Sequence, residues 1–257
     1  MTRPEVVAHR GASFELAEHT LTAYATALEQ GADALECDVR LTADGHLVCV
    51  HDRDLRRTGN GKGLVSSMEL AELSELDFTS WKNPWADLDD EAEERRRDGV
   101  LTLRDLLDLA ASYERPVELA IETKHPTRYA GLVEKRLVEM LAGYGWAGKQ
   151  SPVRVMSFSP RALQRVEKLA PDLRLVMLIE RKRRWPALKP LLGDDWILGP
   201  GIDILSSRKF GDAMERTGRD LHVWTVNTAE QLQVCLDRGV KAVITDRPQF
   251  MLKRLRG

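Results

Sequence analysis

The sequence has few cysteines, no long apolar run and no excess of charge of either sign. Its three cysteines, Cys37, Cys49 and Cys235, form no CxxC pair, and an odd number cannot all pair with one another. We therefore expect free thiols and a reducing compartment. The N-terminal residues MTRPEVVAHRG lack an apolar signal core, and no run reaches the roughly 18 apolar residues of a membrane span. These features predict a cytoplasmic protein without a membrane span.

The charges are nearly balanced, with 38 Lys and Arg against 40 Asp and Glu and a formal net charge of -2. Such a chain has no general reason to bind nucleic acid, so any attraction for an anion must come from local charge. The length of 257 residues is close to that of one (β/α)8 barrel. Neither quantity indicates the oligomeric state.

Short apolar runs alternate with longer amphipathic stretches along the chain. This alternation predicts a parallel sheet, and eight strands are the number that closes a barrel. An open doubly wound sheet is the competing architecture, which periodicity alone does not exclude. The strands are expected at residues 6–9, 34–39, 117–122, 153–158, 173–179, 196–199, 221–226 and 242–245.

Three helices are predicted from their boundary residues. Residues 20–30 carry one apolar stripe and end before Gly31, which is typical of a helix stop. Ser159 and Pro160 resemble an N-cap followed by Pro at the first helical position. Thr228 with Gln231 fits a capping box.

Residues 53–116 interrupt the alternation, because no barrel strand is evident between Asp52 and Val117. The segment follows a hairpin-like stretch at residues 41–47 and contains a glycine-rich turn, a helix near residues 68–76 and a charged stretch at residues 87–98. We interpret it as a small insertion over the C-terminal face of the barrel within a single domain of residues 1–257. It contributes too little apolar material for a core of its own.

Acidic side chains lie at two predicted strand ends. Glu36 and Asp38 point to one face of their strand and Cys37 to the other, because side chains alternate. Two carboxylates on one inward face repel unless a cation or a proton joins them, and hard cations take oxygen ligands. Glu122 ends another strand, with Lys124 two residues on. A metal site is one interpretation; an edge-strand pair and a surface Glu–Lys pair are the alternatives.

Histidines follow two apolar runs, at His9 and His51. Histidine titrates near neutrality and passes protons in either direction. Arg10 can offer a bidentate fork to phosphate, and Gly11 would let the backbone approach a ligand. The remaining histidines are weaker candidates: His46 is expected in a solvated turn, His125 at a helix entry and His222 in a structural strand, while His19 lies beside Glu18.

The segments AHRGAS (residues 8–13), EHT (18–20) and ECDVRLTADGHLVCVHD (36–52) closely resemble the glycerophosphodiester phosphodiesterase family. Segments resembling the later strand ends of that family are IETKHP (121–126), MSFSP (156–160), VWTVN (223–227) and VITDRP (243–248). The motifs occur in the order of the family over nearly the whole chain. Two departures are Ala17, where the family often has Pro, and His19, where it often has Asn.

The resemblance implies a TIM barrel that hydrolyses glycerophosphodiesters to an alcohol and sn-glycerol 3-phosphate. It implies His9 and His51 as the acid–base pair and a divalent cation, Ca2+ or Mg2+, on three carboxylates. It also implies substrate contacts. The implied metal ligands are Glu36, Asp38 and Glu122, and the implied substrate-binding residues are Arg10, Glu18, Lys124, Phe158 and Trp224.

Two other functions stay open. A lysophospholipase D of the same fold would need an apolar surface for an acyl chain, which Trp81, Trp85 and Trp185 could provide. A non-catalytic phosphoester-binding barrel would keep the pocket without turnover, although no catalytic histidine or metal carboxylate is missing.

Overall fold

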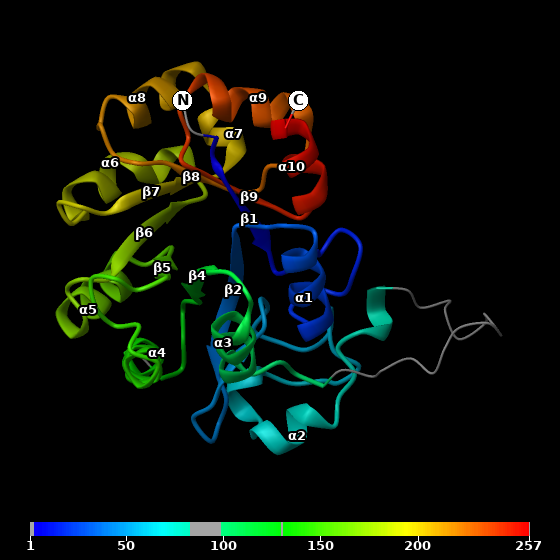
Figure 1. Ribbon diagram of the computed structural model, residues 1–257. Helices are drawn as coiled ribbons and strands as arrows, with labels where there is room; N and C mark the ends of the chain where they lie inside the picture. The colour runs from blue at the N-terminus through cyan, green and yellow to red at the C-terminus, as the bar shows by residue number, and fades with distance from the viewer. Residues whose placement is uncertain (1–2, 83–98, 130, 257) are drawn as a thin grey trace.

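Eight parallel strands and the helices between them form a (β/α)8 barrel in the computed structural model, which describes residues 3–82, 99–129 and 131–256 (Figure 1). Neighbouring strands follow the order β7-β6-β5-β4-β2-β1-β9-β8. The parallel strands are β1 (Glu5–His9), β2 (Ala34–Leu41), β4 (Glu118–Thr123), β5 (Val153–Ser157), β6 (Arg174–Ile179), β7 (Ile197–Pro200), β8 (His222–Val223) and β9 (Ala242–Thr245). The predicted barrel is thus confirmed.

Two single bridges join β7 to β8 and nearly close the barrel. Leu198 pairs with Leu221, and Gly201 pairs with Trp224, both in parallel. We expected a strand over residues 221–226, but only His222–Val223 forms continuous pairing. The doubly wound alternative is excluded, because its two sheet edges would lie far apart.

Helices cover the outside of the barrel (Figure 1). They are α1 (Leu21–Glu29), α3 (Leu103–Ser112), α4 (Leu132–Gly143), α5 (Pro160–Leu169), α6 (Trp185–Leu188), α7 (Ile202–Leu205), α8 (Arg208–Glu215), α9 (Ala229–Asp237) and α10 (Pro248–Arg256). The predicted caps are confirmed: the side chain of Thr20 accepts from Ala23 N, that of Ser159 accepts from Ala162 N, and Thr228 forms its capping box. Gly31 has a φ of 92°, as a helix stop requires.

The interior of the barrel changes in character from one end to the other. At the N-terminal ends of the strands, the buried Arg154 pairs with Glu5 at 2.8 Å and with Glu118 at 2.9 Å. An apolar layer follows, formed by Val7, Ala34, Ala120, Met156, Val176, Leu178, Ala242 and Ile244. Polar side chains return at the C-terminal ends, where active sites of this fold are found.

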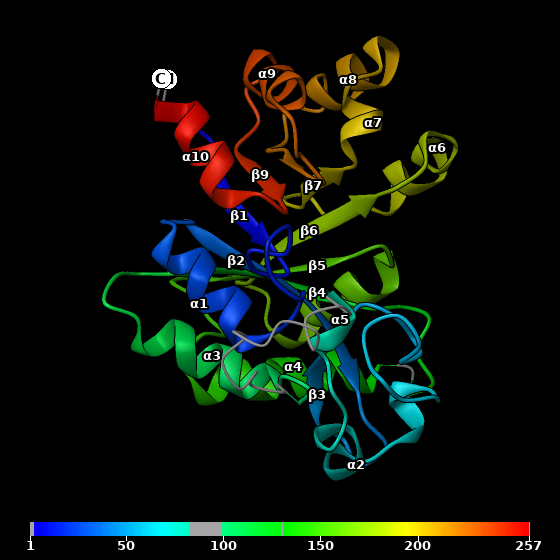
Figure 2. The same ribbon diagram turned by 90° about the vertical axis from the view of Figure 1, so that its right-hand side faces the viewer.

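The segment between β2 and β4 begins with β3 (Leu47–Cys49), which pairs antiparallel with β2 and confirms the expected hairpin. α2 (Leu70–Ser74) follows. Figure 2 shows this segment on the side toward which the barrel strands point. The segment buries a small apolar cluster that we did not expect, consisting of Val48, Val50, Leu55, Val65, Leu73, Phe78 and Val100. Its last helix, α3, packs against α1 and β3 as part of the barrel. The whole of the charged stretch at 87–98 lies outside the described residues.

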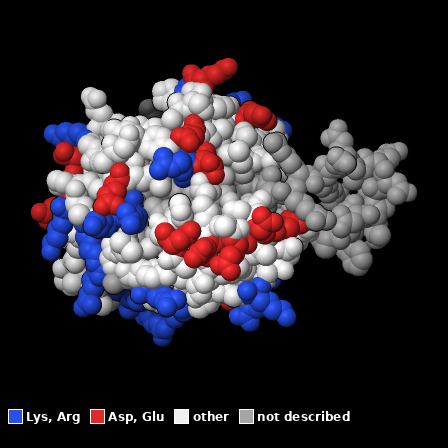
Figure 3. Space-filling model, turned by 90° about the horizontal axis from the view of Figure 1, so that it is seen from below, with Lys and Arg blue, Asp and Glu red and all other residues white. Residues whose placement is uncertain are grey.

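The surface carries clusters of both signs. The face seen in Figure 3 has acidic side chains near its middle and Lys and Arg side chains mainly toward its left and lower edges. The basic run Arg181–Arg184 follows β6 at the C-terminal end of that strand, and Lys182–Arg184 form a short helix. None of the helices in the described ranges combines the length and apolarity that crossing a bilayer requires.

Candidate active site

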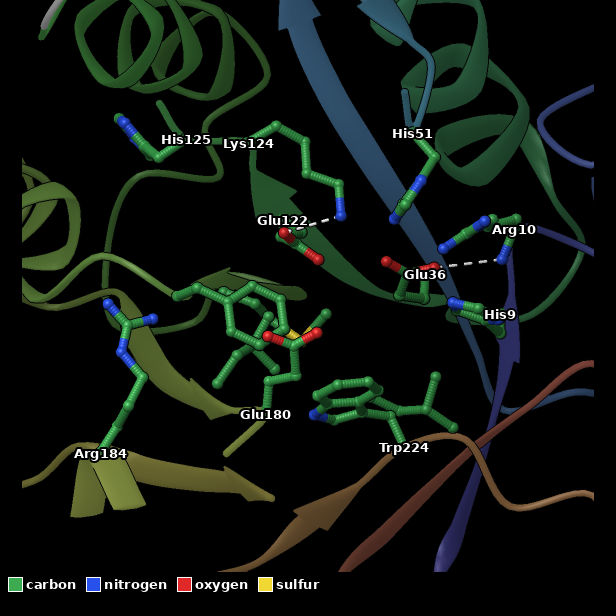
Figure 4. A pocket seen from close by; sticks show the side chains of 14 residues that line it. His9, Arg10, Glu36, His51, Glu122, Lys124, His125, Glu180, Arg184 and Trp224 are labelled. Atoms are coloured by element: carbon green, nitrogen blue, oxygen red, sulfur yellow. Dashed lines mark hydrogen bonds and ion pairs between the residues drawn. The ribbon is translucent and has the colours of Figure 1, made fainter. Parts of the chain in front are cut away.

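A cavity of about 310 Å³ opens among the C-terminal ends of the barrel strands (Figure 4). Eight of the ten predicted site residues line it, and Glu18 and Asp38 do not. The eight are His9, Arg10, Glu36, His51, Glu122, Lys124, Phe158 and Trp224. The fold therefore gathers residues from both halves of the chain into one wall.

Three carboxylates form a compact group in this wall. Oxygens of Glu36, Asp38 and Glu122 lie within 4.8 Å of one another, and all three side chains are buried. Glu36 and Asp38 share the inward face of β2, while Cys37 packs in the outer core, as alternation predicted. Burial is the main cause that raises the pKa of Glu36 well above its usual range, and the negative charge of Asp38 is the second. The same two causes, burial first and the negative charge of Asp38 second, raise the pKa of Glu122 to about 8.

Asp38 is held by three nitrogen-bearing side chains. Its Oδ1 lies 2.9 Å from Lys124 Nζ, and its Oδ2 lies 3.0 Å from both Arg10 Nε and His19 Nε2. Lys124 Nζ also lies 2.8 Å from Glu122 Oε1. Burial raises the pKa of Asp38, but Lys124 and Arg10 outweigh burial and hold the pKa well below its usual range. Asp38 is therefore ionised, and Lys124 stands between two of the carboxylates.

The donor set fits a hard divalent cation. Oxygen-only ligands from carboxylates are the preference of Ca2+ and Mg2+. Burial and the charge of Asp38 raise the pKa values of Glu36 and Glu122 by more than the nearby Lys124 lowers them. A bound cation would supply further positive charge.

His9, at the end of β1, donates from Nδ1 to Asp246 Oδ1 over 2.6 Å. Asp246 also accepts hydrogen bonds from Ser13 Oγ at 3.1 Å and from Asn227 Nδ2 at 2.6 Å. Burial raises the pKa of Asp246, but these hydrogen bonds and the His9 ring outweigh it and lower the pKa to about 2. The ring is thus oriented by a carboxylate, with Nε2 left for the cavity that His9 lines.

His51, which also lines the cavity, has a similar neighbour. Its Nδ1 lies 2.8 Å from Asp52 Oδ1, and Asp52 Oδ2 accepts from Arg57 Nε at 2.5 Å. Burial, together with Lys124 and Arg10, lowers the pKa of His51 to about 4. His51 is therefore neutral at physiological pH in this state of the site.

Arg10 is supported from behind the cavity wall. Its Nη1 donates to Glu18 Oε1 over 3.0 Å, and Glu18 also accepts two hydrogen bonds of 2.7 Å from Arg57. Glu18 therefore positions the two arginines and does not reach the cavity. Gly11 does not line the cavity, and a Cβ there would lie 2.7 Å from the backbone of Ala23, so glycine allows α1 to approach.

An aromatic wall faces the carboxylates. The rings of Phe158 and Trp224 meet edge to face with centroids 5.4 Å apart, and Trp224 Nε1 donates to Gly199 O over 2.8 Å. Both rings line the cavity beside Glu180 and Arg184 (Figure 4). The wall thus offers apolar surface on one side and charged groups at its rim.

Sequence reasoning missed several residues of the site. Asp246 and Asn227 lay within quoted motifs without an assigned role, and Asp52 directly follows a predicted catalytic residue. His19 was left unassigned, although it is buried against Asp38, and its φ of 60° lies where Asn and His are tolerated. His125 was wrongly expected at a helix entry: α4 begins at Leu132, and His125 lines the cavity with Nε2 2.7 Å from Glu134 Oε1.

The two other weak histidine candidates behave as expected. His46 has a side chain that is 56% exposed in the hairpin turn. His222 is buried in β8, and burial holds its pKa well below the usual range. Cys37, Cys49 and Cys235 are free and buried, as predicted.

Known proteins resemble this chain over nearly its full length. Probable glycerophosphodiester phosphodiesterase 1 of Mycobacterium tuberculosis (strain ATCC 25618 / H37Rv) is 42% identical, with 95% of this chain and 90% of the relative covered. Glycerophosphodiester phosphodiesterase of Bacillus subtilis (strain 168) is 36% identical, with 98% and 86% covered. Among solved structures, an Oleispira antarctica phosphodiesterase in complex with the product sn-glycerol-3-phosphate matches with a TM-score of 0.84 and 26% identity, covering 99% of this chain and 98% of that one.

The family model described as "Glycerophosphoryl diester phosphodiesterase family" matches residues 9–250. This span contains both histidines, all three carboxylates and the aromatic wall of the cavity. The chain belongs to the glycerophosphoryl diester phosphodiesterase family.

Proposed function

We propose that this enzyme hydrolyses glycerophosphodiesters to an alcohol and sn-glycerol 3-phosphate. The observation that carries the proposal is the meeting of two carboxylate-backed histidines, three clustered carboxylates and Arg10 around one cavity. A phosphodiester resists attack because its negative charge repels nucleophiles, and this cavity supplies both positive charge and proton carriers. Membership of the family and the product-bound Oleispira antarctica structure support the same reaction.

His9 and His51 divide the proton transfers in this proposal. One takes a proton from the attacking oxygen, and the other gives a proton to the leaving alkoxide. Their Nδ1 atoms are engaged by Asp246 and Asp52, so Nε2 of each ring is the atom that serves the substrate. Arg10, with Lys124 beside it, stabilises the charge that develops on the phosphoryl oxygens.

Glu36, Asp38 and Glu122 would hold a divalent cation, Ca2+ or Mg2+, in the proposed holoenzyme. Such a cation would neutralise phosphate charge and make a nearby hydroxyl more acidic. Lys124 must then share Glu122 and Asp38 with the cation, because it contacts both carboxylates. This sharing would leave its ammonium group free to turn toward phosphate.

The aromatic wall would hold the glycerol part of the substrate. Phe158 and Trp224 offer a face and an edge to its carbon chain. We propose that the 2-hydroxyl of the glycerol attacks phosphorus, because an attached hydroxyl is already positioned and oriented intramolecular attack reaches effective molarities of up to roughly 10⁵–10⁸ M. This attack breaks the bond from phosphorus to the head-group oxygen, releases the alcohol and leaves a cyclic glycerol phosphate. Water then opens the cyclic phosphate, with the two histidines exchanging roles.

A lysophospholipase D activity has less support. Trp185 is buried in the outer core and offers no surface to an acyl chain. Trp81 is half-buried, with its Nε1 bonded to Phe78 O, and Trp85 lies outside the described residues. The three buried thiols suit a reducing compartment such as the cytoplasm, where we place the protein.

The test is release of sn-glycerol 3-phosphate by the purified protein. Glycerophosphocholine, glycerophosphoethanolamine, glycerophosphoinositol and a lysophospholipid should each be supplied with Ca2+, Mg2+ or chelator. We expect cation-dependent release from the three water-soluble diesters, and none from the folded His9→Ala/His51→Ala variant. Release from the lysophospholipid alone would favour lysophospholipase D, and saturable binding without any release would favour a phosphoester-binding barrel.

A further inference from the structure

We infer that Asp246 is the positioning residue that fixes the proton of His9 on Nδ1 and turns Nε2 to the substrate. The inference rests on the proposed function for its catalytic consequence. Its structural basis is the 2.6 Å hydrogen bond between His9 Nδ1 and Asp246 Oδ1, which joins the first and last strands of the barrel at their C-terminal ends. A carboxylate can only accept, so the Nδ1 atom must carry the hydrogen.

A second residue fixes Asp246 itself. Asn227 Oδ1 accepts from the backbone N–H of Asp246 at 2.9 Å and from Thr245 Oγ1 at 3.1 Å. This orientation directs Asn227 Nδ2 to Asp246 Oδ2, at 2.6 Å. Because Oδ2 is occupied and Ser13 Oγ donates to Oδ1, the carboxylate is held with Oδ1 facing the imidazole.

The groups that bond to Asp246 distinguish its arrangement with His9 from the arrangement of Asp52 with His51. Within residues 3–82, 99–129 and 131–256, the side chains that bond to Asp246 besides His9 are the neutral Ser13 and Asn227. Asp52, in contrast, shares its charge with Arg57. The carboxylate of Asp246 therefore acts on His9 without a competing cation bonded to it, and it can stabilise the imidazolium that forms whenever His9 takes a proton.

The Asn227 geometry makes Asp246→Asn a decisive substitution. The new amide has only one oxygen, but both Asn227 Nδ2 and His9 Nδ1 need an acceptor at this position. If its oxygen faces Asn227 Nδ2, its NH2 group faces His9 Nδ1 and forces the ring proton to Nε2. If its oxygen faces His9, two NH2 groups oppose each other. The variant is therefore expected to invert the His9 tautomer, because the other orientation sets two NH2 groups against each other and breaks the link to Asn227.

A double variant reverses this effect. In Asp246→Asn/Asn227→Asp, the carboxylate at position 227 accepts from both the backbone N–H and the side-chain NH2 of position 246. The amide oxygen of position 246 can then accept from His9 Nδ1. All the hydrogen bonds return, but the negative charge lies one side chain further from the imidazole.

The experiment measures kcat, KM and the His9 tautomer, the last by ¹H–¹⁵N NMR with the His9 signal assigned through His9→Ala. For Asp246→Asn we expect the proton on Nε2, a loss in kcat of about 10²-fold to 10⁴-fold and little change in KM. The double variant should return the proton to Nδ1 and recover kcat by roughly tenfold or more. Asp52→Asn is the matched control, and it should leave the His9 tautomer unchanged.

Wild-type kcat, or an unchanged His9 tautomer, in folded Asp246→Asn would overturn the inference. If that variant does not fold, the double variant decides: His9 protonated on Nδ1 supports the inference, and on Nε2 overturns it. Failure of the proposed function is recognised separately, because wild-type protein would then release no sn-glycerol 3-phosphate while the tautomer measurement still tests the role of Asp246.

Discussion

Cation binding to the three carboxylates should be linked to the release of protons. Burial raises the pKa of Glu122 from its usual 4.5 to about 8, with a further contribution from the charge of Asp38. The same two causes raise the pKa of Glu36. Metal ligands must be ionised, so a cation displaces these protons. We therefore predict that Ca2+ and Mg2+ bind more tightly as pH rises from 6 to 8.

The size of this pH effect on cation affinity follows from the ionisation of Glu122. At pH 7, one unit below a pKa of about 8, roughly one tenth of this side chain is ionised. Glu122 alone therefore weakens binding about tenfold, or about 1.4 kcal/mol, relative to the high-pH limit. The folded pKa lies above the unfolded one, so the stabilising effect of the proton is present below pH 4.5 and lost as pH rises through about 8. Metal-free protein should thus melt at lower temperature toward pH 8.

Isothermal titration calorimetry at pH 6, 7 and 8, in two buffers with different ionisation enthalpies, measures both affinity and protons released. Glu122→Gln should weaken binding and release fewer protons. Glu118→Gln is the matched control, because Glu118 lies at the opposite end of β4, paired with Arg154. An affinity independent of pH in the wild-type protein, or binding without proton release, would refute the reasoning.

His9→Ala and His51→Ala should each lower kcat by about 10²-fold to 10⁴-fold, and the double variant by much less than the product, because the residues act together. Wild-type turnover in either folded single variant would remove that histidine from the mechanism. Replacing residues 181–184 by Ala should lower kcat/KM at low salt and have less effect at high salt, since Arg184 lines the cavity. Unchanged kcat/KM at low salt would mean that this basic run is only a solvated segment. A substrate lacking the 2-hydroxyl should bind with similar affinity and scarcely turn over. Comparable hydrolysis of this analogue would indicate attack by water.

Local patterns predicted the features that depend on neighbouring residues. The N-caps at Thr20, Ser159 and Thr228 formed as expected, because a capping side chain and its backbone N–H donor lie within three residues. Glu36 and Asp38 share one face of β2, because the geometry of a strand fixes that alternation. The close approach of Gly11 to Ala23 of α1 could not be predicted, since the two residues meet only across space.

The sequence by itself determined the alternation of strands and helices, the order of the motifs and the chemistry placed at the strand ends. Tertiary structure alone decided which groups meet. Asp246 reaches His9 because β9 and β1 pair in the barrel, although 237 positions separate the two residues. Pairing of β2 with β4 brings Asp38 to Lys124, and the segment between β3 and β4 brings Arg57 to Glu18. Hydrogen bonds and pKa shifts depend on distances of a few ångströms and on burial, and both quantities exist only after the strands have closed around the site.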